Sequence, residues 1–432
     1  MSILNVTCGP AALDQPRGQS DRRYGGGTHF QVGPATAAVC CSLRVEGMPV
    51  GDFEDGSDVF VFDTLENLAI ATAVPVSRNE KITDPASGRP RIIIKYPIVG
   101  GFVPFGAKRS DGTLHPHAGT GFGIGQALDF PMLEGGYYAK EHKDTEMVRL
   151  TDVTQFAFDG AEFQVAECER HGAGNLLEAS DSGWFLISPG LRPGIADGDD
   201  LLCTAFATRS DSTEYLPLPA ASGVARWRRQ SGRWQPVDFI PVAHTGNAID
   251  EKDKRPPTWA EPSLICDTDG SLLFTARGAY GDLDHVIRIW RSTDNGENWE
   301  VVINRERARG QAPITINQAA DGTPYVVANR LGYERDWLAL WPLSDDRKSL
   351  KDPIDVRNAT AEFGPPPSGM VWFMDHASGE TVRLADGRWH HLLSYRIMDR
   401  GEHGGGAPPP QTGLYLEEVA SAGEPLAGWR FG

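Results

Sequence analysis

The chain has 432 residues, enough for two or three average domains, although all-β folds of repeated sheets often reach this length as one domain. Its 41 basic and 58 acidic residues give a net charge of −17, which argues against nucleic acid or an anionic membrane as the main partner. An anionic substrate would therefore need a locally basic pocket. The 49 glycines, 31 prolines and 11 tryptophans favour β structure, since few stretches have helical period.

The N-terminal residues contain no readable export signal, because they lack both a basic segment and an apolar one, and no run reaches the length of a membrane span. The six cysteines show neither CxxC spacing nor the density of a disulfide scaffold. This pattern suits a reducing compartment and favours the cytoplasm. Successive residues of a strand point to opposite faces, so we expect at most one of Cys40 and Cys41 to lie in the core.

The composition changes after the first few tens of residues. Residues 1–35 are rich in Gly, Pro and charge, and we expect them to form an arm on the surface. Residues 36–432 then form a single domain. A long loop at 105–121 and a Gly- and Pro-rich stretch at 397–411 are candidates for the functional face, because loops on a rigid scaffold carry binding groups.

One pattern recurs along this domain: an apolar strand, a turn with Asp-Gly or a near equivalent, and a second apolar strand. It occupies residues 175–190, 262–278, 313–330 and 380–396, and a second hairpin that tends to end in Trp follows each copy. Four antiparallel strands per repeat predict an all-β propeller with six blades, and seven blades are the alternative. We expect an N-terminal strand to pair with the C-terminal strands, because an open last blade would leave an exposed edge.

The segment from Arg288 to Glu300 reads RIWRSTDNGENWE and predicts a hairpin turn between two strands. In it, Asp294 can accept hydrogen bonds from turn N–H groups, Gly296 can take positive φ, and Trp299 can cover the turn. The pattern Ser292-x-Asp294-x-Gly296-x-x-Trp299 resembles the Asp-box, or BNR repeat, of sialidase-like β-propellers. In that family the boxes lie away from the active face, so the resemblance bears on the fold and not on chemistry.

A carboxylate and a guanidinium flank the second hairpin. Glu261 precedes its first strand and Arg277 ends its second, so the two side chains can meet near one end of the blade. This arrangement resembles sialidases and other six-bladed glycan hydrolases, in which such a Glu polarises a Tyr nucleophile and such an Arg grips the substrate carboxylate. Arg binds a carboxylate through two parallel hydrogen bonds, which Lys cannot do.

Arginines recur at the ends of related strands. Arg330 and Arg396 close the equivalent strands of the next repeats, and Arg170, followed by His171, precedes the first repeat. They can converge on a central channel as an anion clamp. The alternative is that they solvate the edges of the blades.

The sequence also departs from the sialidase pattern. Where the family has its Tyr, residues 374–379 read MDHASG, and the nearest tyrosine is Tyr395, one strand later. The expected acidic general acid is replaced by His115 and His117. These histidines, with His171 and Tyr395, are candidate proton-transfer groups, since a His pKa near neutrality suits this role. The pair His115 and His117 is weak evidence for a metal without a third ligand, so we assign no metal site and no cofactor.

These observations predict a carbohydrate-active enzyme with an anionic sugar as substrate and with neither nucleic acid nor membrane as a partner. The first hypothesis is a sialidase-like exo-glycosidase with Glu261, His115, His117 and Tyr395 as catalytic groups and the arginines as substrate contacts. The alternatives are a uronate lyase with a His or Tyr base, and a glycan-binding propeller without activity, because fold does not fix function. We expect Glu261 and Arg277 to line the central cavity near His115 or His117.

Overall fold

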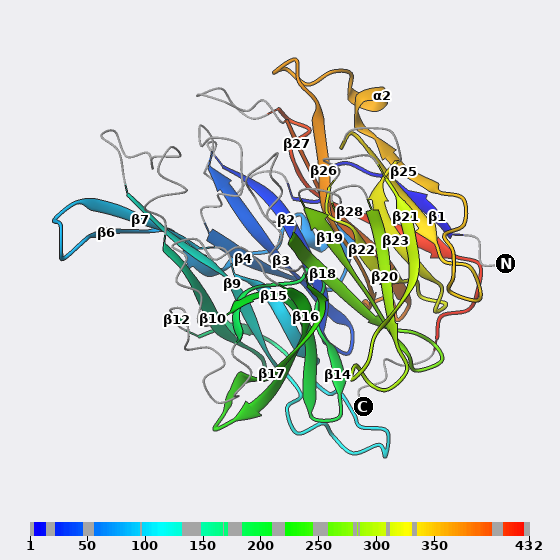
Figure 1. Cartoon of the computed structure of the whole chain (residues 1–432), viewed down its shortest axis with the longest axis horizontal. Helices are drawn as coiled ribbons and strands as arrows, with labels where there is room; N and C mark the ends of the chain where they lie inside the picture. The colour runs from blue at the N-terminus through cyan, green and yellow to red at the C-terminus, as the bar shows by residue number, and fades with distance from the viewer. Residues whose placement is uncertain are drawn as a thin grey trace.

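The chain folds as a six-bladed β-propeller. The computed structural model describes residues 4–13, 22–45, 56–95, 97–131, 148–166, 168–171, 184–209, 221–244, 258–279, 283, 286–307, 312–330, 335–399 and 409–426. These residues form six antiparallel sheets around a common axis (Figure 1). The inner strands of neighbouring sheets contact one another all the way around the axis, and the sixth sheet contacts the first, so the ring is closed. The predicted six blades are therefore confirmed.

The strands of the first three sheets follow one another along the chain. The first sheet contains β2 (Arg22–Gly33), β3 (Thr36–Val45), β4 (Gly56–Phe62) and β5 (Val74–Arg78). The second contains β6 (Glu80–Thr83), β7 (Pro90–Lys95), β8 (Ile98–Val103), β9 (Thr120–Pro131), β10 (Val148–Phe158), β11 (Phe163–Val165) and β12 (Glu169–His171). The third contains β13 (Trp184–Pro189), β14 (Ile195–Asp197), β15 (Asp200–Arg209), β16 (Ala221–Gln230) and β17 (Arg233–His244).

The last three sheets each have four strands. The fourth contains β18 (Thr258–Cys266), β19 (Leu272–Ala279), β20 (Val286–Ser292) and β21 (Glu300–Glu306), and the fifth contains β22 (Thr315–Gln318), β23 (Pro324–Asn329), β24 (Trp337–Pro342) and β25 (Ile354–Asn358). The sixth contains β26 (Trp372–Arg383), β27 (Trp389–Asp399), β28 (Gly413–Ser421) and β1 (Leu4–Thr7). The helices of the described residues are α1 (Leu65–Leu68) and α2 (Ala359–Phe363), neither of which is long and apolar enough to cross a membrane.

An N-terminal strand closes the ring, as predicted. β1 pairs with β28 in antiparallel register, with Val6 opposite Val419, and Leu4 is 2% exposed. The expectation of a surface arm over residues 1–35 is wrong for the described part, because β1 belongs to the sixth sheet and β2 is the first strand of the first sheet. The glycines that suggested an arm instead allow β2 to pack closely, as at Gly27, where an added Cβ would lie 3.0 Å from the Cβ of Cys41.

Each sheet is covered on both faces by its neighbours. Cys40 and Cys41 are both fully buried, so the prediction that at most one of them lies in the core is wrong. Cys40 packs in a cluster with Val99 of the second sheet, and Cys41 packs in a cluster with Val382 of the sixth. Strand alternation still sends the two thiols to opposite faces, but in a propeller both faces are interior.

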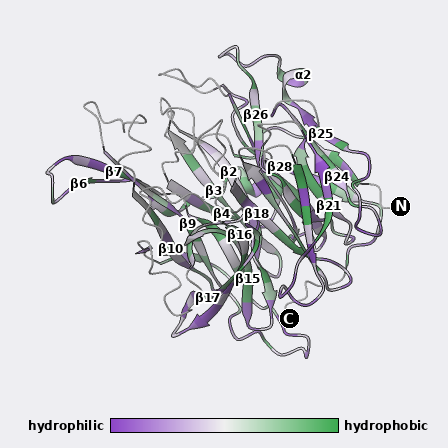
Figure 2. Cartoon of the chain, in the orientation of Figure 1, coloured by the Kyte–Doolittle hydropathy of each residue, from purple (hydrophilic) through white to green (hydrophobic). Residues whose placement is uncertain are grey.

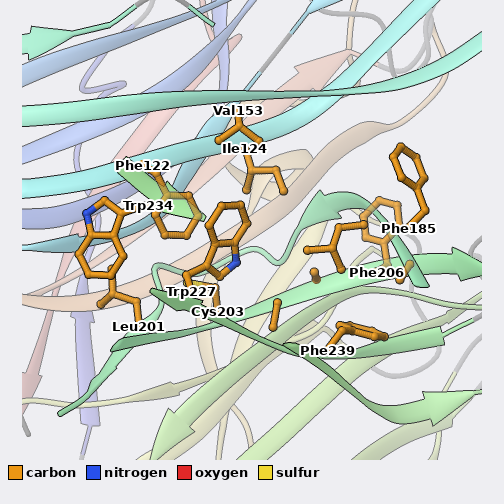
Figure 3. Packing of buried hydrophobic residues seen from close by; sticks show 14 of the residues in the cluster. Phe122, Ile124, Val153, Phe185, Leu201, Cys203, Phe206, Trp227, Trp234 and Phe239 are labelled. Carbon is orange, nitrogen blue, oxygen red and sulfur yellow. The ribbon is translucent and has the colours of Figure 1, made fainter. Parts of the chain in front are cut away.

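The largest aromatic cluster lies between the second and third sheets. Figure 3 shows the ring of Phe122 beside that of Trp227, with Trp234 nearby. The rings of Phe122 and Trp227 are stacked, with a centroid distance of 3.9 Å and an interplanar angle of 20°. Figure 2 shows the same pattern over the molecule, with hydrophobic residues within the sheets and hydrophilic ones along the outer part of β17 and the projecting β6–β7 hairpin. The packing between sheets therefore fixes the relative positions of the blades.

The hairpin turns lie where the repeats predict them, at 267–271, 319–323 and 384–388. In these three turns Gly270, Gly322 and Gly387 have positive φ. The turn of the repeat at 175–190 lies outside the described residues, as does most of the 397–411 stretch. We call the end of the propeller with these turns the lower face. The opposite end, where the strands nearest the axis begin, is the upper face.

The segment 292–299 forms the predicted turn on the lower face. Asp294 accepts hydrogen bonds from the Asn298 N–H (2.9 Å) and the Ser292 hydroxyl (2.8 Å), and Gly296 has a φ of 91°. The side chain and backbone of Asn298, then Ser292, lower the pKa of Asp294 to about 2. Trp299 donates to the Gly296 carbonyl at 2.9 Å and contacts Phe274 edge to face.

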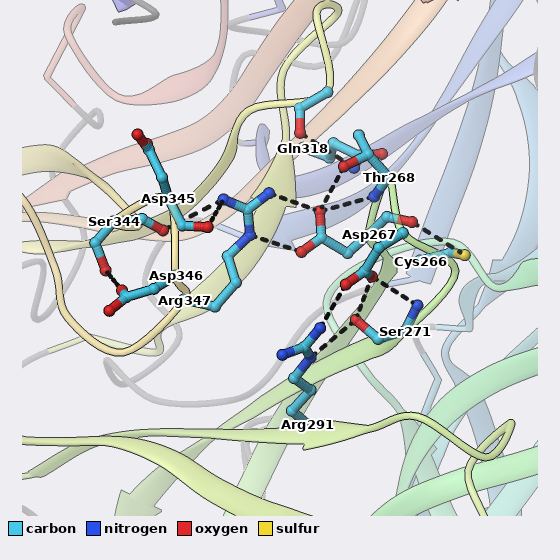
Figure 4. A network of polar contacts seen from close by, with 12 residues as sticks. Cys266, Asp267, Thr268, Ser271, Arg291, Gln318, Ser344, Asp345, Asp346 and Arg347 are labelled. Atoms are coloured by element: carbon cyan, nitrogen blue, oxygen red, sulfur yellow. Dashed lines mark hydrogen bonds and ion pairs between the residues drawn. The ribbon is translucent and has the colours of Figure 1, made fainter.

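A polar network joins the fourth and fifth sheets on this face (Figure 4). Arg347 donates to both oxygens of Asp267 at 2.7 and 3.0 Å, and Arg291 pairs with Asp269. All four residues lie in turns or at strand ends of the lower face, and Asp267 is 4% exposed. We interpret this network as structural.

We expect Leu4→Ala to lower the free energy of unfolding by about 2–4 kcal/mol, because it leaves a cavity where β1 packs against the core of the last two sheets. Val301→Ala, on the outer strand β21 where Val301 is 51% exposed, is the control and should change stability by less than about 1 kcal/mol. Urea unfolding followed by tryptophan fluorescence measures both. Equal effects of the two substitutions would contradict the closing role of β1.

Candidate functional site

Two residues inside strands have an unusual backbone. In the described residues, five residues other than glycine have positive φ, and Ser231, Asn295 and Arg347 among them lie in turns. Glu261 (φ 50°) and His376 (φ 53°) instead lie within β18 and β26. Such a conformation costs on the order of 1–3 kcal/mol, so it persists only where surrounding contacts hold it, and it is common at functional sites.

Both residues sit in β-bulges at equivalent places in the fourth and sixth sheets. The register of β18 against β19 shifts between Ala260 and Ser263, and that of β26 against β27 shifts between Asp375 and Ser378. A bulge turns a side chain away from its usual alternation. Here both bulges lie near the start of a first strand, so they direct Glu261 and His376 to the upper end of the axis.

The two re-directed side chains meet. The His376 Nε2 lies 3.6 Å from the Glu261 Oε1, and the Arg277 Nη1 donates to the Glu261 Oε2 at 3.0 Å. The side chains of Glu261, Arg277 and His376 are 21%, 21% and 26% exposed, so solvent reaches each of them.

A buried carboxylate, Asp375, holds His376 from the other side. Its Oδ1 lies 2.9 Å from the His376 Nδ1, and Arg335 and Arg396 donate to its Oδ2 at 3.0 and 3.3 Å. Arg396 also pairs with the Oδ1 through its Nε. Burial opposes the charge of Asp375, but Arg396, His376 and Arg335 together hold its pKa well below the usual range. Asp375 is therefore an anion at neutral pH.

This contact orients the imidazole ring. An anionic Asp375 accepts a hydrogen bond from His376 Nδ1–H, which leaves Nε2 directed toward Glu261. An imidazole oriented by a carboxylate can accept a proton at Nε2 and release it again, and Glu261 lies within reach of the same proton. The pair has the geometry of an acid–base site.

Arg335 joins the parts of the cluster electrostatically. Burial lowers the pKa of its guanidinium. The carboxylates of Asp375 and Glu261 raise this pKa, and the guanidinium groups of Arg277 and Arg396 lower it. Arg335 therefore lies within electrostatic range of all four groups. Among the described residues of the cluster, three guanidinium groups face two carboxylates, which leaves an excess of one positive charge even when His376 is neutral. The site is locally basic in a chain whose net charge is −17.

The first sheet also reaches the site. A Cβ added to Gly26 would lie 3.1 Å from the Cβ and 3.5 Å from the Cγ of His376. Below the cluster, Arg192 of the third sheet extends to Glu380 of the sixth at 2.6 Å and donates to the Leu264 carbonyl of the fourth at 3.2 Å. Arg192 is 4% exposed, so this ion pair lies buried where the inner strands meet.

Comparisons with solved structures match this architecture. A protein of unknown function from Dyadobacter fermentans is 11% identical, with a TM-score of 0.50 over 96% of this chain and 98% of that chain. Trypanosoma rangeli sialidase in complex with the inhibitor DANA is 10% identical, with a TM-score of 0.50 over 97% of this chain and 59% of that chain. The fold is shared with glycosidase propellers. At such identities the similarity shows the fold alone.

A third solved structure is the Penicillium chrysogenum α-L-arabinanase complexed with arabinobiose, 10% identical with a TM-score of 0.49 over 98% of this chain and 100% of that chain. No protein-family model and no curated protein matches the sequence. The chemistry of this propeller must therefore be argued from its own side chains.

The structure brings together only part of the predicted site. Glu261 pairs with Arg277, as the hairpin register predicts, and Arg396 lies in the same cluster. Arg330 does not, because it follows the end of β23 and pairs with Asp355 of the outer strand β25 at 2.7 Å. Its ring partner is Trp337, 5.1 Å from the guanidinium carbon. Arg330 thus follows the alternative interpretation, in which strand-end arginines solvate the edge of a blade.

The prediction that His115 and His117 lie near Glu261 is wrong. They lie in the loop between β8 and β9, which is at the lower face, whereas Glu261 lies near the upper end of its strand. The His115 Nε2 is 3.1 Å from the Gly198 carbonyl oxygen, and the His117 ring packs edge to face on Trp234. The sequence shows that this loop follows an apolar strand, but it does not show at which end of the propeller that strand ends.

Tyr395 is also placed away from the cluster. It is fully buried between the fifth and sixth sheets, donates to Glu417 at 2.9 Å and stacks on Tyr415. Burial, then Glu417, raises its pKa well above the usual value. Strand alternation sends Tyr395 to the face opposite that of Arg396, so a nucleophilic or basic role at Glu261 is excluded by position.

Arg170 and His171 lie on β12, at the outer edge of the second sheet. Arg170 pairs with Asp152 of β10 at 2.9 Å and with Glu80 at 3.6 Å. Burial lowers the pKa of His171. The sequence suggested that these residues open a repeat at the axis, but β12 pairs with β10 and extends an earlier sheet.

Sequence analysis missed Arg335, Asp375 and His376 as site residues. A signal existed for the last two, because AEPS (260–263) and DHAS (375–378) align across two repeats, with Glu261 and His376 at the same position. Arg335 carries no such signal, since it precedes β24 outside the repeated hairpins. In the part of the chain that the structure describes, no three His, Cys, Asp or Glu side chains are placed to hold a metal ion.

We expect Asp375→Asn to lower the free energy of unfolding at neutral pH by about 3–5 kcal/mol, because it leaves Arg335 and Arg396 without their buried anion. The folded-state pKa of Asp375 is lowered, so its stabilising effect is present above the ordinary aspartate pKa and is lost as the pH falls below it. The difference between wild type and variant should therefore shrink below about pH 4. Urea unfolding at several pH values measures it, and a difference independent of pH would contradict the assigned charge.

Proposed function

We propose that this propeller is a carbohydrate-active enzyme that cleaves a glycosidic bond of an anionic sugar at its upper face. In this proposal His376 and Glu261 transfer protons, Asp375 and Arg396 orient His376, and Arg277 and Arg335 contact the acidic group of the substrate. The supporting observation is the pair of left-handed residues, Glu261 and His376, that two equivalent bulges bring within 3.6 Å of each other.

The charges of the cluster support an acidic substrate. Arg277 and Arg335 keep 21% and 16% of their side chains exposed, whereas Arg396 is 9% exposed and turned to Asp375. Exposed guanidinium groups offer two parallel N–H donors to a carboxylate, and partial burial strengthens that contact. The exposed pair would fix the acidic sugar, while the buried arginine keeps Asp375 ionised.

The cluster differs from the arrangement that a sialidase mechanism needs. Tyr395 is buried elsewhere, and within the described residues of the cluster the exposed carboxylate is that of Glu261. We therefore propose proton transfer by an oriented imidazole in place of a tyrosine nucleophile. Hydrolysis would use His376 or Glu261 to activate water and the other group to protonate the leaving oxygen.

The same geometry supports a second reaction, β-elimination of a uronate. An arginine bound to the uronate carboxylate acidifies the proton on the adjacent carbon. The imidazole held by Asp375 would remove this proton while the bond from the next ring carbon to the glycosidic oxygen breaks, and the leaving oxygen would take a proton from Glu261 or from water. The observation that favours this candidate is the 2.9 Å contact between the Asp375 Oδ1 and the His376 Nδ1, which leaves Nε2 directed toward Glu261. The two reactions differ in their products.

A panel of an aryl sialoside, an aryl glucuronide, an oligogalacturonate and a heparan sulfate oligosaccharide separates these possibilities. A lyase product absorbs in the ultraviolet as an unsaturated uronate, and a hydrolase product gives a new reducing end without that absorbance. Binding by calorimetry with neither product indicates a glycan-binding propeller. The absence of both binding and turnover across broad substrate libraries would contradict the proposal.

We expect His376→Ala and Glu261→Gln each to lower kcat on the best substrate by roughly a hundredfold or more, because each removes a proton-transfer group. His117→Ala is the matched control, since His117 is a partly exposed histidine at the lower face. Its kcat should stay within about twofold of wild type. A control variant as impaired as His376→Ala, with the fold intact by circular dichroism, would contradict the assignment.

We expect Arg277→Ala to lower kcat/KM on the acidic substrate by about a hundredfold, because a charge-assisted bidentate contact contributes roughly 2–3 kcal/mol. Arg330→Ala removes an arginine of similar exposure from an ion pair on the outer strand and should change kcat/KM less than twofold. Steady-state kinetics on an acidic sugar and on its neutral methyl ester provide the comparison. An equal loss on both substrates would show that Arg277 does not read the charge.

A further inference from the structure

A loop of the third sheet interrupts the strand nearest the axis. β13 and β14 both pair with β15, so they are two parts of one inner strand, and residues 190–194 lie between them. A Cβ added to Gly190 would overlap the carbonyl oxygen of Pro262 in β18. Glycine therefore allows this loop to pack directly on the backbone of the fourth sheet.

The loop holds the bulge that carries Glu261. The Leu191 N–H donates to the Pro262 carbonyl oxygen at 2.9 Å, and the Thr204 hydroxyl of β15 donates to the same oxygen at 3.2 Å. Pro262 follows Glu261 directly, so both hydrogen bonds act on the backbone next to the residue whose φ is 50°. A positive φ within a strand persists only where such contacts hold it.

The next residue of the loop, Arg192, joins three inner strands. Its Nη1 donates to the Leu264 carbonyl oxygen of β18 at 3.2 Å and to the Ile316 carbonyl oxygen of β22 at 3.4 Å. Its Nη2 donates to the Glu380 Oε2 of β26 at 2.6 Å. Arg192 and Glu380 are 4% and 7% exposed, so this contact is a buried ion pair. One guanidinium thus links both strands that contain the bulges.

We propose that Arg192 is a positioning residue, which fixes the separation of β18 and β26 and thereby the 3.6 Å between the Glu261 Oε1 and the His376 Nε2. This inference rests on the proposed function. Leu264 lies three residues after Glu261, and Glu380 lies four residues after His376. A shift of either strand therefore moves a proton-transfer group, and a misplacement of about 1 Å can lower a rate by up to about a hundredfold.

The test replaces both partners of the ion pair, because a single substitution would leave the other charge buried without its counterion. In the variant Arg192→Met/Glu380→Met, apolar side chains of similar length take the place of the pair, a change that is often close to neutral for stability. The matched control is Arg347→Met/Asp267→Leu, which removes another ion pair between sheets, at the lower face. Urea unfolding compares the stability of the two variants.

Arg192→Met/Glu380→Met should lower kcat about tenfold or more, whereas the control variant should keep kcat within about twofold of wild type. In a His376→Ala background the same double substitution should change kcat less than about twofold, because the pair that it positions is already broken. An unchanged kcat in the first comparison would overturn the inference. A tenfold loss in both backgrounds would show a structural role alone and would overturn it as well.

Crystal structures of the wild type and of Arg192→Met/Glu380→Met separate this inference from the proposed function. A longer distance between Glu261 and His376 in the variant, without turnover of any acidic sugar by the wild type, would keep the positioning role and reject the enzymatic function. An unchanged distance in the variant would overturn the positioning role, whether or not the wild type is active.

Discussion

The candidate site depends on one buried anion. Asp375 is 1% exposed and is held by Arg335 from the fifth sheet and by Arg396 and His376 from its own sheet. A buried carboxylate is costly unless it is paired and hydrogen-bonded, and each of these partners would itself be unstable there without it. The arrangement therefore holds as a unit, and it orients the ring of His376, a residue whose φ is 53°.

The propeller makes this unit possible because its inner strands meet at one axis. Glu261 and Arg277 come from the fourth sheet, Arg335 from the fifth, and Gly26 of the first sheet leaves room for the imidazole ring. The bulges in β18 and β26 are needed as well, since regular alternation would turn Glu261 and His376 into the packing between sheets. Rigid sheets, closed by β1, then support a strained local geometry.

The charge of the site is opposite to that of the chain as a whole. A net charge of −17 disfavours anions at most of the surface, but three guanidinium groups near the axis exceed the two carboxylates that face them. A weakly hydrated planar guanidinium tolerates partial burial better than an ammonium does, so arginine is the suitable cation in this position.

The sequence by itself determined the propeller, its closure and the Glu261–Arg277 pair, because periodic strands, Asp-Gly turns and hairpin register are local properties. Whether other residues meet depends on which end of the axis a loop occupies and which face of a strand a side chain takes. His115 and His117 proved to lie at the lower face, Tyr395 between two sheets, and Arg330 at an outer edge. Only the tertiary structure could bring Arg335, Asp375 and His376 into contact with Glu261 or its partners, because the alignment of two repeats marks equivalent positions but does not show which side chains meet between sheets.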